Sequence, residues 1–393
     1  MNDPTPARRP FPSRGPSGET TETTPRAADG QRAGWFELFF DLVFVVTVNV
    51  LADGLHGDPG PADFGRFLVL FFPAWWAWIN LTMTSNVFGP STPRVQAMLL
   101  AAMPGLGLMA AAAPEGLGDR AWAFALGVAW VHLVLFLPWQ GPARRAEIGL
   151  PRWRPVLYGL VPALLWATSA ALPAPGRFAL WAVAIGLEIA LLAHHSVATR
   201  VYEALVMEHL VERIGLFMVI VFGESVLTIV TALTDHFTPT SAAAALTGFL
   251  TIAGLAVVFY LWGSPTTARG LDHVQATGTT RAIRDTVMFL PFALVAGTTV
   301  IAAALGTATA EPDHPFPTGA GWALLGGFFT YYTTSAALAL RYGDTPTAVL
   351  RWYVPCLLTV AALLPAVLLL PAWAAVATTA AALLAVIAWA SRP

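Results

Sequence analysis

The chain has 393 residues, of which 56% are hydrophobic and 11% charged, and its formal net charge is −2. Soluble domains carry roughly 25% charged residues, so this composition excludes an ordinary soluble protein and is typical of membrane-spanning helices. The near-neutral charge gives no electrostatic footprint for nucleic acid as a partner. The single cysteine, Cys356, excludes an intramolecular disulfide and a cysteine-based metal site.

The first 34 residues differ from the rest of the chain because they are rich in Pro, Arg, Ser and Thr. A segment of this composition cannot bury enough apolar surface to fold. We therefore predict that residues 1–34 form a disordered tail that precedes the first membrane span.

Apolar runs of about 20 residues recur along the rest of the chain and predict about twelve transmembrane helices. The runs cover residues 35–53, 66–86, 95–113, 120–139, 155–172, 177–198, 214–233, 241–262, 285–307, 319–340, 350–370 and 372–390. The expected fold class is therefore all-α, a polytopic transmembrane helical bundle whose main partner is the lipid bilayer.

The basic residues, which are all arginines, test the number and direction of these spans, because cytoplasmic loops are enriched in Lys and Arg. With the N-terminus in the cytoplasm, the outer side receives only Arg66, Arg120 and Arg177. The outer loops then carry mostly acids, which are Asp53, Asp58, Asp63, Glu115, Asp119, Asp235, Glu311 and Asp313. We therefore predict that both termini are cytoplasmic.

A short internal similarity suggests that the chain has two halves. Residues 39–44 and 222–227 share the pattern Phe-x-acid-x-Val followed by a large apolar residue. Phe and Val are common in any span, so chance is the alternative explanation. Because the two patterns lie in the first and seventh spans, they predict parallel six-helix repeats, residues 35–200 and 201–393. An amphipathic lead-in, residues 203–213, precedes the seventh span.

Three acidic residues lie inside predicted spans and are the leading functional candidates. Glu37 and Asp41 are four residues apart and share one face of the first helix, and Glu224 occupies the matching place in the seventh. A charge at such a depth costs about 2.5–3.5 kcal/mol by insertion scales and commonly marks an ion or proton path. We predict that these carboxylates couple to a cation or a proton. The alternative is a purely structural pairing with a buried arginine.

The lead-in supplies candidates for the counter-ion or gate. Arg213 is the natural counter-ion for Glu37 or Asp41 if the first and seventh spans pack together, and His209 and Glu212 accompany it. The alternative is a helix end that is solvated at the membrane surface.

Glu188 and His195 share a face of the sixth span, and with Asn49 and Asn80 they form a candidate polar relay, since histidine carries protons near neutral pH. Packed hydrogen-bonding groups are the alternative. The His-x-x-Glu spacing of the lead-in resembles the Glu-x-x-His sites of helical bundles only in reverse order and without a second copy. The sequence therefore predicts neither a metal nor another cofactor.

Two segments together are similar to the signature of the bacterial low temperature requirement protein A (LtrA) family. They are residues 35–46, Trp-Phe-Glu-Leu-Phe-Phe-Asp-Leu-Val-Phe-Val-Val, and residues 209–226, which contain His-Leu-Val-Glu-Arg and Phe-Gly-Glu-Ser-Val. The resemblance implies a polytopic protein of the bacterial inner membrane that is linked to growth in the cold, and it implies no particular reaction. The family's polar motif positions are held here by Glu37, Asp41, His209, Glu212, Arg213 and Glu224.

The leading hypothesis is therefore a non-enzymatic transporter or ion-permeation protein for an unidentified small ion or solute. One alternative is a protein of membrane stress or cold adaptation whose buried charges only fix helix packing. The other is a membrane-embedded metalloenzyme. Neither the transported species nor the oligomeric state follows from the sequence.

Overall fold

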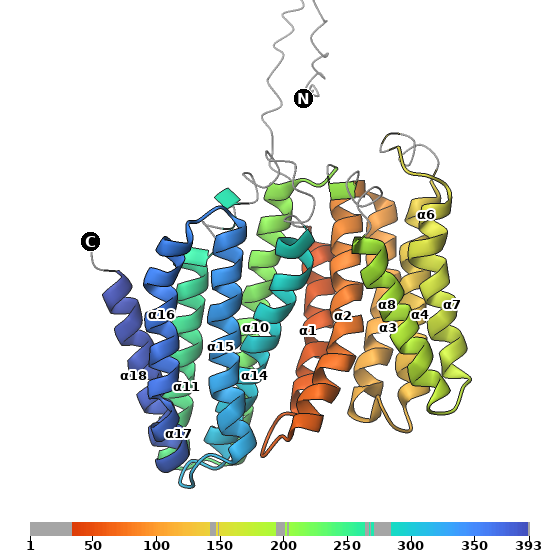
Figure 1. Cartoon of the computed structure of the whole chain (residues 1–393). Coiled ribbons are helices and arrows are strands. Elements are labelled where there is room, and N and C mark those ends of the chain that lie inside the picture. The colour runs from red at the N-terminus through yellow and green to blue at the C-terminus, as the bar shows by residue number, and fades with distance from the viewer. Residues whose placement is uncertain are drawn as a thin grey trace, which may run out of the picture. The chain divides into compact units, whose positions relative to one another are not determined.

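The computed structural model describes residues 34–141, 147, 149–193, 201–202, 204–263, 267, 269–270 and 284–391, and within these residues the chain is all helical. This confirms the all-α class expected from the apolar runs. The predicted tail lies, up to residue 33, outside the described part of the chain. Figure 1 shows the long helices lying side by side and running in alternating directions.

The first half of the chain forms helices at each of the first six predicted spans. They are α1 (Trp35–Asp53), α2 (Pro61–Phe88), α3 (Pro93–Ala112), α4 (Ala121–Phe136), α6 (Trp153–Pro155), α7 (Val161–Ala170) and α8 (Gly176–Ala193). A π-helical turn, Val156–Leu160, joins α6 to α7 into one helical segment. Short 3₁₀ turns, Ala113–Glu115 and Pro138–Gln140, follow α3 and α4.

The second half forms helices at the remaining six predicted spans. They are α10 (Met207–Asp235), α11 (Pro239–Val258), α14 (Leu290–Ala310), α15 (Thr318–Arg341), α16 (Pro346–Ala362), α17 (Leu364–Leu369) and α18 (Ala372–Ala390). A π-helical turn, Phe259–Gly263, extends α11, and another, Asp285–Phe289, leads into α14.

Ten helical segments among the described residues are long and apolar enough to cross a membrane. They include residues 93–115, which run through Pro104 without a break, and the pair 346–369 and 372–390, which are separated by only Leu370 and Pro371. The two other predicted spans, near 155–172 and 177–198, are helical at residues 155–170 and 177–193 but are not among the ten.

Proline sets many of the helix boundaries. Pro61, Pro93, Pro239 and Pro346 each occupy the first position of a helix, where the missing N–H would have had no intrahelical partner. Pro371 separates α17 from α18, because its ring cannot continue the preceding helix.

The two halves pack their helices in the same order. In the first half α1 packs against α3, α3 against α4 and α4 against α7, and in the second half α10 packs against α14, α14 against α15 and α15 against α16. The α3–α4 crossing brings Gly127 against Gly105, and the α14–α15 crossing brings Gly327 against Gly297, so closely that a Cβ at Gly127 or Gly327 would lie 2.7 or 2.9 Å from the other glycine's carbonyl oxygen. Small residues are what allows helices to approach this closely.

The loop between α1 and α2 ties the halves together at the end opposite to where α1 begins. The Gly57 N–H donates to Thr307 Oγ1 at 3.0 Å, and the Gly319 N–H donates to Asp58 Oδ1 at 2.6 Å. Gly319 lies so close to Pro59 that any side chain there would collide with the Pro59 backbone. The loop is therefore fitted onto α14 and α15, while α1 itself packs beside α10 (Figure 1).

Candidate functional site

The carboxylates of α1 lie on the face of the helix that is turned into the protein. Glu37 is 0% exposed and Asp41 is 1% exposed, whereas Phe39, Leu42 and Val46 on the other face are about half exposed. The spacing of four residues places both acids on one face. Because a charge facing lipid would be costly, the apolar face of α1 is the one suited to contact the bilayer.

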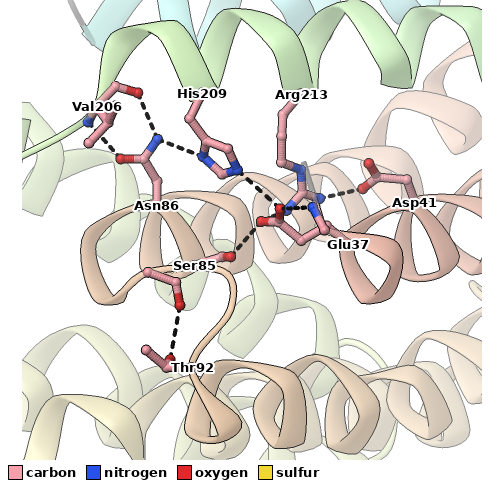
Figure 2. Close-up of polar contacts among 10 residues, drawn as sticks. Glu37, Asp41, Ser85, Asn86, Thr92, Val206, His209 and Arg213 are labelled. Carbon is pink, nitrogen blue, oxygen red and sulfur yellow. Dashed lines mark hydrogen bonds and ion pairs between the residues drawn. The ribbon is translucent and has the colours of Figure 1, made fainter. Parts of the chain in front are cut away.

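Arg213 of α10 bridges the two carboxylates. Its Nη1 donates to Glu37 Oε1 at 2.7 Å and its Nη2 donates to Asp41 Oδ1 at 2.5 Å, and the arginine is completely buried (Figure 2). Charge-assisted bonds of this kind are roughly twice as strong as neutral ones. The counter-ion expected from the sequence is therefore present, and one guanidinium serves both acids.

Helix α2 supplies neutral donors to the same carboxylates, and the sequence alone did not identify them. The Ser85 hydroxyl donates to Glu37 Oε1 at 2.5 Å, and Trp78 Nε1 donates to Asp41 Oδ1 at 2.8 Å. Trp78 and Ser85 are seven residues apart and therefore share a face of α2. That spacing was the available signal, but it does not say which helix the face would meet.

Hydrogen bonds from Asn86 fix the tautomer of His209. The Val206 N–H donates to Asn86 Oδ1 at 2.8 Å and Asn86 Nδ2 donates to the Val206 carbonyl at 2.9 Å, which orients the amide. Its NH₂ group then faces His209 Nδ1 at 3.1 Å. That nitrogen must accept, so Nε2 carries the proton and donates to Glu37 Oε2 at 3.0 Å, and the ring is neutral (Figure 2).

The resulting group, which we call the charge network, consists of Glu37, Asp41, His209 and Arg213. Two carboxylates against one guanidinium, with a neutral imidazole, leave one negative charge in excess. Asp41 Oδ2 and Arg213 Nε are buried without a hydrogen-bond partner. An uncompensated charge in a dry interior is costly, and among the four carboxylate oxygens of the network Asp41 Oδ2 alone has no donor.

Aromatic rings keep the charge network dry. The ring of Trp78 lies 4.4 Å from that of Phe217 and 5.0 Å from that of Trp75, and the Arg213 guanidinium lies 5.8 Å from the Trp78 ring. The low dielectric of this environment strengthens every electrostatic interaction of the network. The tryptophans of α2 therefore pack around the charges.

Glu224 lies apart from the charge network. It is half-buried and lines a small cavity of about 20 Å³ with Asn49 and His56, and the residues that line this cavity do not include Asp41. Glu224 lies three helical turns beyond Arg213, about 16 Å along α10 at 1.5 Å per residue. The expectation that Asp41 and Glu224 lie at matched depth fails because α10 begins at Met207, so the level of Asp41 is that of Arg213.

The described relay candidates lie in two places, Glu188 and Asn80 near His132 and Asn49 near Glu224. Glu188 on α8 contacts His132 on α4, with 3.0 Å between Oε1 and Nε2. Asn80 donates to the Trp76 carbonyl of its own helix, whereas Asn49 lines the cavity of Glu224. His195 lies outside the described residues.

The geometry gives no support to a metal site in the lead-in. Glu212 is half-buried on α10, whereas both ring nitrogens of His209 are engaged by Asn86 and Glu37. In the part of the chain that the structure describes, no three His, Cys, Asp or Glu side chains are grouped as metal ligands.

Comparison with known proteins places the chain in a family. The model of the family described as bacterial low temperature requirement A protein (LtrA) matches residues 32–388. An uncharacterized protein of Rhizobium meliloti (strain 1021) is 27% identical over 212 residues, which are 51% of this chain and 51% of that protein. The chain thus aligns with about half the length of this relative, and no solved structure gives a significant match. Since the family match covers nearly the whole chain and both polar segments, the chain belongs to the bacterial low temperature requirement A protein (LtrA) family.

Proposed function

We propose that this protein is a transporter or ion-permeation protein of the bacterial inner membrane, and that the charge network binds and releases a proton or small cation. The observation that carries the proposal is the unpartnered Asp41 Oδ2 in a buried group with one excess negative charge. Ionisable groups inside a membrane protein typically mark ion pathways or proton relays.

The position of the network provides a way to couple ion binding to movement. Arg213 belongs to α10 of the second half, whereas Glu37 and Asp41 belong to α1 of the first. A proton on Asp41 would neutralise the carboxylate and weaken its bond to Arg213. The attraction between the two halves would then depend on whether the site is occupied, which is the requirement for coupled transport.

We also propose that the end at which α1 begins faces the cytoplasm. Among the described residues, Arg94, Arg152, Arg341 and Arg351 lie at or near this end of their helices, at the α2–α3, α6 and α15–α16 connections. The connections at the opposite end carry mostly acids, which include Asp58, Asp63, Glu115, Asp119 and Asp313. This asymmetry follows the rule that cytoplasmic loops are rich in arginine.

Currents recorded after a pH jump test the coupling role without knowledge of the substrate. Proteoliposomes that contain the full chain are adsorbed to a supported membrane, and the charge displaced by proton binding is measured. We expect a transient current in the wild type that falls about tenfold in Asp41→Asn, because the substitution removes the site that accepts the proton.

Asp119→Asn is the matched control, since it removes an exposed carboxylate by the same chemical change. Its current should equal that of the wild type. If Asp41→Asn inserts and folds normally and still gives the full current, the proposal is wrong.

The second candidate function is a structural protein of cold adaptation whose charges only lock the helices, in keeping with the name of the family. The pairing of Glu37 with Arg213 favours it, since both oxygens of Glu37 and both terminal nitrogens of Arg213 are hydrogen-bonded. This function requires that Asp41→Asn lower the melting temperature while wild type and variant give no current.

A further inference from the structure

A second polar cavity lies in the first half of the chain, away from the charge network. Its volume is about 70 Å³, and its polar lining consists of Asn80, Thr84, His132, Arg154, Tyr158 and Tyr202. These side chains come from α2, α4, the α6–α7 segment and the short helical stretch before α10. Since a water molecule needs about 10–15 Å³ by this measure, the cavity holds a group of about five water-sized atoms.

Arg154 brings a positive charge to this cavity, and no carboxylate in the described part of the chain balances it. The residue is 9% exposed, and its guanidinium carbon lies 4.6 Å from the Tyr158 ring and 5.6 Å from the Trp139 ring. Its Nε atom has no hydrogen-bond partner, and no described carboxylate lies within salt-bridge distance of it. The cation is therefore held by aromatic faces, and its Nε donor is free.

His132 adds a second unpartnered nitrogen to the same cavity. The residue is 3% exposed, its Nε2 contacts Glu188, and its Nδ1 has no hydrogen-bond partner. Buried polar atoms are almost always paired, yet Arg154 and His132, which both line this cavity, each keep one unpaired buried nitrogen.

The other polar side chains of the cavity offer hydrogen-bond donors and carry no negative charge that would repel an anion. Asn80 uses one of its two amide hydrogens on the Trp76 carbonyl, and the Thr84 hydroxyl accepts from Trp139 and keeps its own hydrogen to donate. Burial raises the pKa of the Tyr202 phenol well above its usual value, so this wall carries no negative charge.

We propose that this cavity is a binding site for a small oxyanion, a phosphate or carboxylate group, with Arg154 as its charged anchor. The guanidinium presents a planar set of donors that matches these anions, and Asn80 and Thr84 supply further hydrogen bonds. The group could belong to a free anion or to the head of an anionic lipid, since both offer the same oxygens. The cavity lies toward the end at which α1 begins, since Asn80 and Thr84 lie in the last third of α2 and Arg154 lies at the start of the α6–α7 segment.

Thermal unfolding of the purified full chain in an uncharged detergent tests the site. We expect inorganic phosphate, and more weakly acetate, to raise the melting temperature by a few degrees over chloride at equal ionic strength, because a ligand that binds only the folded state stabilises it. Titration calorimetry with phosphate should give saturable binding of one anion per chain. The absence of both effects in the wild type would overturn the proposal.

Two arginines that lie close together in sequence provide a matched pair of variants. Arg154→Gln should lose the stabilisation by phosphate, whereas Arg152→Gln, which removes an exposed charge, should keep it. If Arg154→Gln does not fold, Arg154→Lys keeps the charge without the planar fork and should bind phosphate several-fold more weakly. Equal phosphate binding by wild type, Arg154→Lys and Arg154→Gln contradicts the proposal.

Lipid discs distinguish the two sources of the anion. If a lipid head is the occupant, discs of phosphatidylglycerol should stabilise the wild type relative to phosphatidylcholine and should abolish the phosphate effect. If a free anion is the occupant, the phosphate effect should persist in both lipids. Asp41→Asn should leave phosphate binding unchanged, so the oxyanion site and the proposed coupling role can fail separately.

Discussion

Arg213 is the guanidinium that compensates both carboxylates of α1. Bringing three ionised groups out of water is expensive, and the cost is recovered only while each charge keeps its partner. Loss of the arginine would leave Glu37 and Asp41 facing each other in a dry environment, whereas removal of all three charges would leave only polar groups to be satisfied.

Arg213→Met should therefore lower the free energy of unfolding by about 3–5 kcal/mol, the usual result of breaking a buried ion pair from one side. Adding Glu37→Gln and Asp41→Asn to this variant should restore a large part of the loss. Denaturant melts of the three proteins in detergent measure the difference. A triple variant less stable than Arg213→Met would contradict this account of the network.

At the level of single residues, the sequence identified the groups that carry charge but not the neutral groups that hold them. Helical spacing was sufficient to place Glu37 and Asp41 on one face and to name Arg213 as their counter-ion. Ser85, Trp78 and Asn86 were missed, because their roles depend on the packing of α2 against α1 and α10. No spacing within one helix carries that information.

At the scale of helices, the glycine crossings decide how closely neighbouring helices approach. Gly327 and Gly326 are adjacent on α15, but an added Cβ would lie 2.5 Å from the Ile301 side chain at Gly327 and would meet nothing within 4 Å at Gly326. The Gly327 Cβ would also lie 2.9 Å from the Gly297 carbonyl oxygen, which cannot move without shifting α14.

Gly327→Ala should therefore cost about 1–3 kcal/mol of stability, the usual effect of overpacking a well-filled interior. Gly326→Ala should be neutral or should stabilise by up to about 1 kcal/mol, since alanine has the higher helix propensity. Melting temperatures of the two variants test the difference. Equal stability would show that α14 and α15 separate easily.

The helix boundaries show where hydropathy alone predicts the ends of a helix and where it does not. The apolar runs predicted the position of every long helix in the described part of the chain, because length and hydrophobicity alone define a span. They placed the start of the seventh span at residue 214, whereas α10 begins at Met207, since His209 and Arg213 are buried against α1 and α2. Polar partners on neighbouring helices extend a buried helix beyond its apolar run.

At the scale of the whole molecule, the same order of packing in both halves supports the prediction of two parallel repeats, which stays a prediction. The first half places α1, α3, α4 and α7 in successive contact, and the second half does the same with α10, α14, α15 and α16. The repeat signal in the sequence was a single short pattern, because close packing requires small residues at a few positions and constrains little else.

The proposed orientation predicts which loops a reagent can reach from outside the cell. In a Cys356→Ser background, Asp119→Cys lies between α3 and α4, and Asp344→Cys lies between α15 and α16 at the other end. A membrane-impermeant maleimide should label Asp119→Cys in intact cells and Asp344→Cys only in inverted vesicles. The opposite result would reverse the orientation.

The loop that fastens Gly57 and Asp58 to α14 and α15 has a mechanical consequence. The two halves of the chain are joined at two places, by the Arg213 ion pairs near the start of α1 and by the loop's hydrogen bonds at the far end. If the Arg213 ion pairs break while the Gly57 and Asp58 hydrogen bonds remain, the far end acts as a hinge. A rotation of one half relative to the other would then separate the helices only at the arginine-rich end, and the acidic end would remain closed.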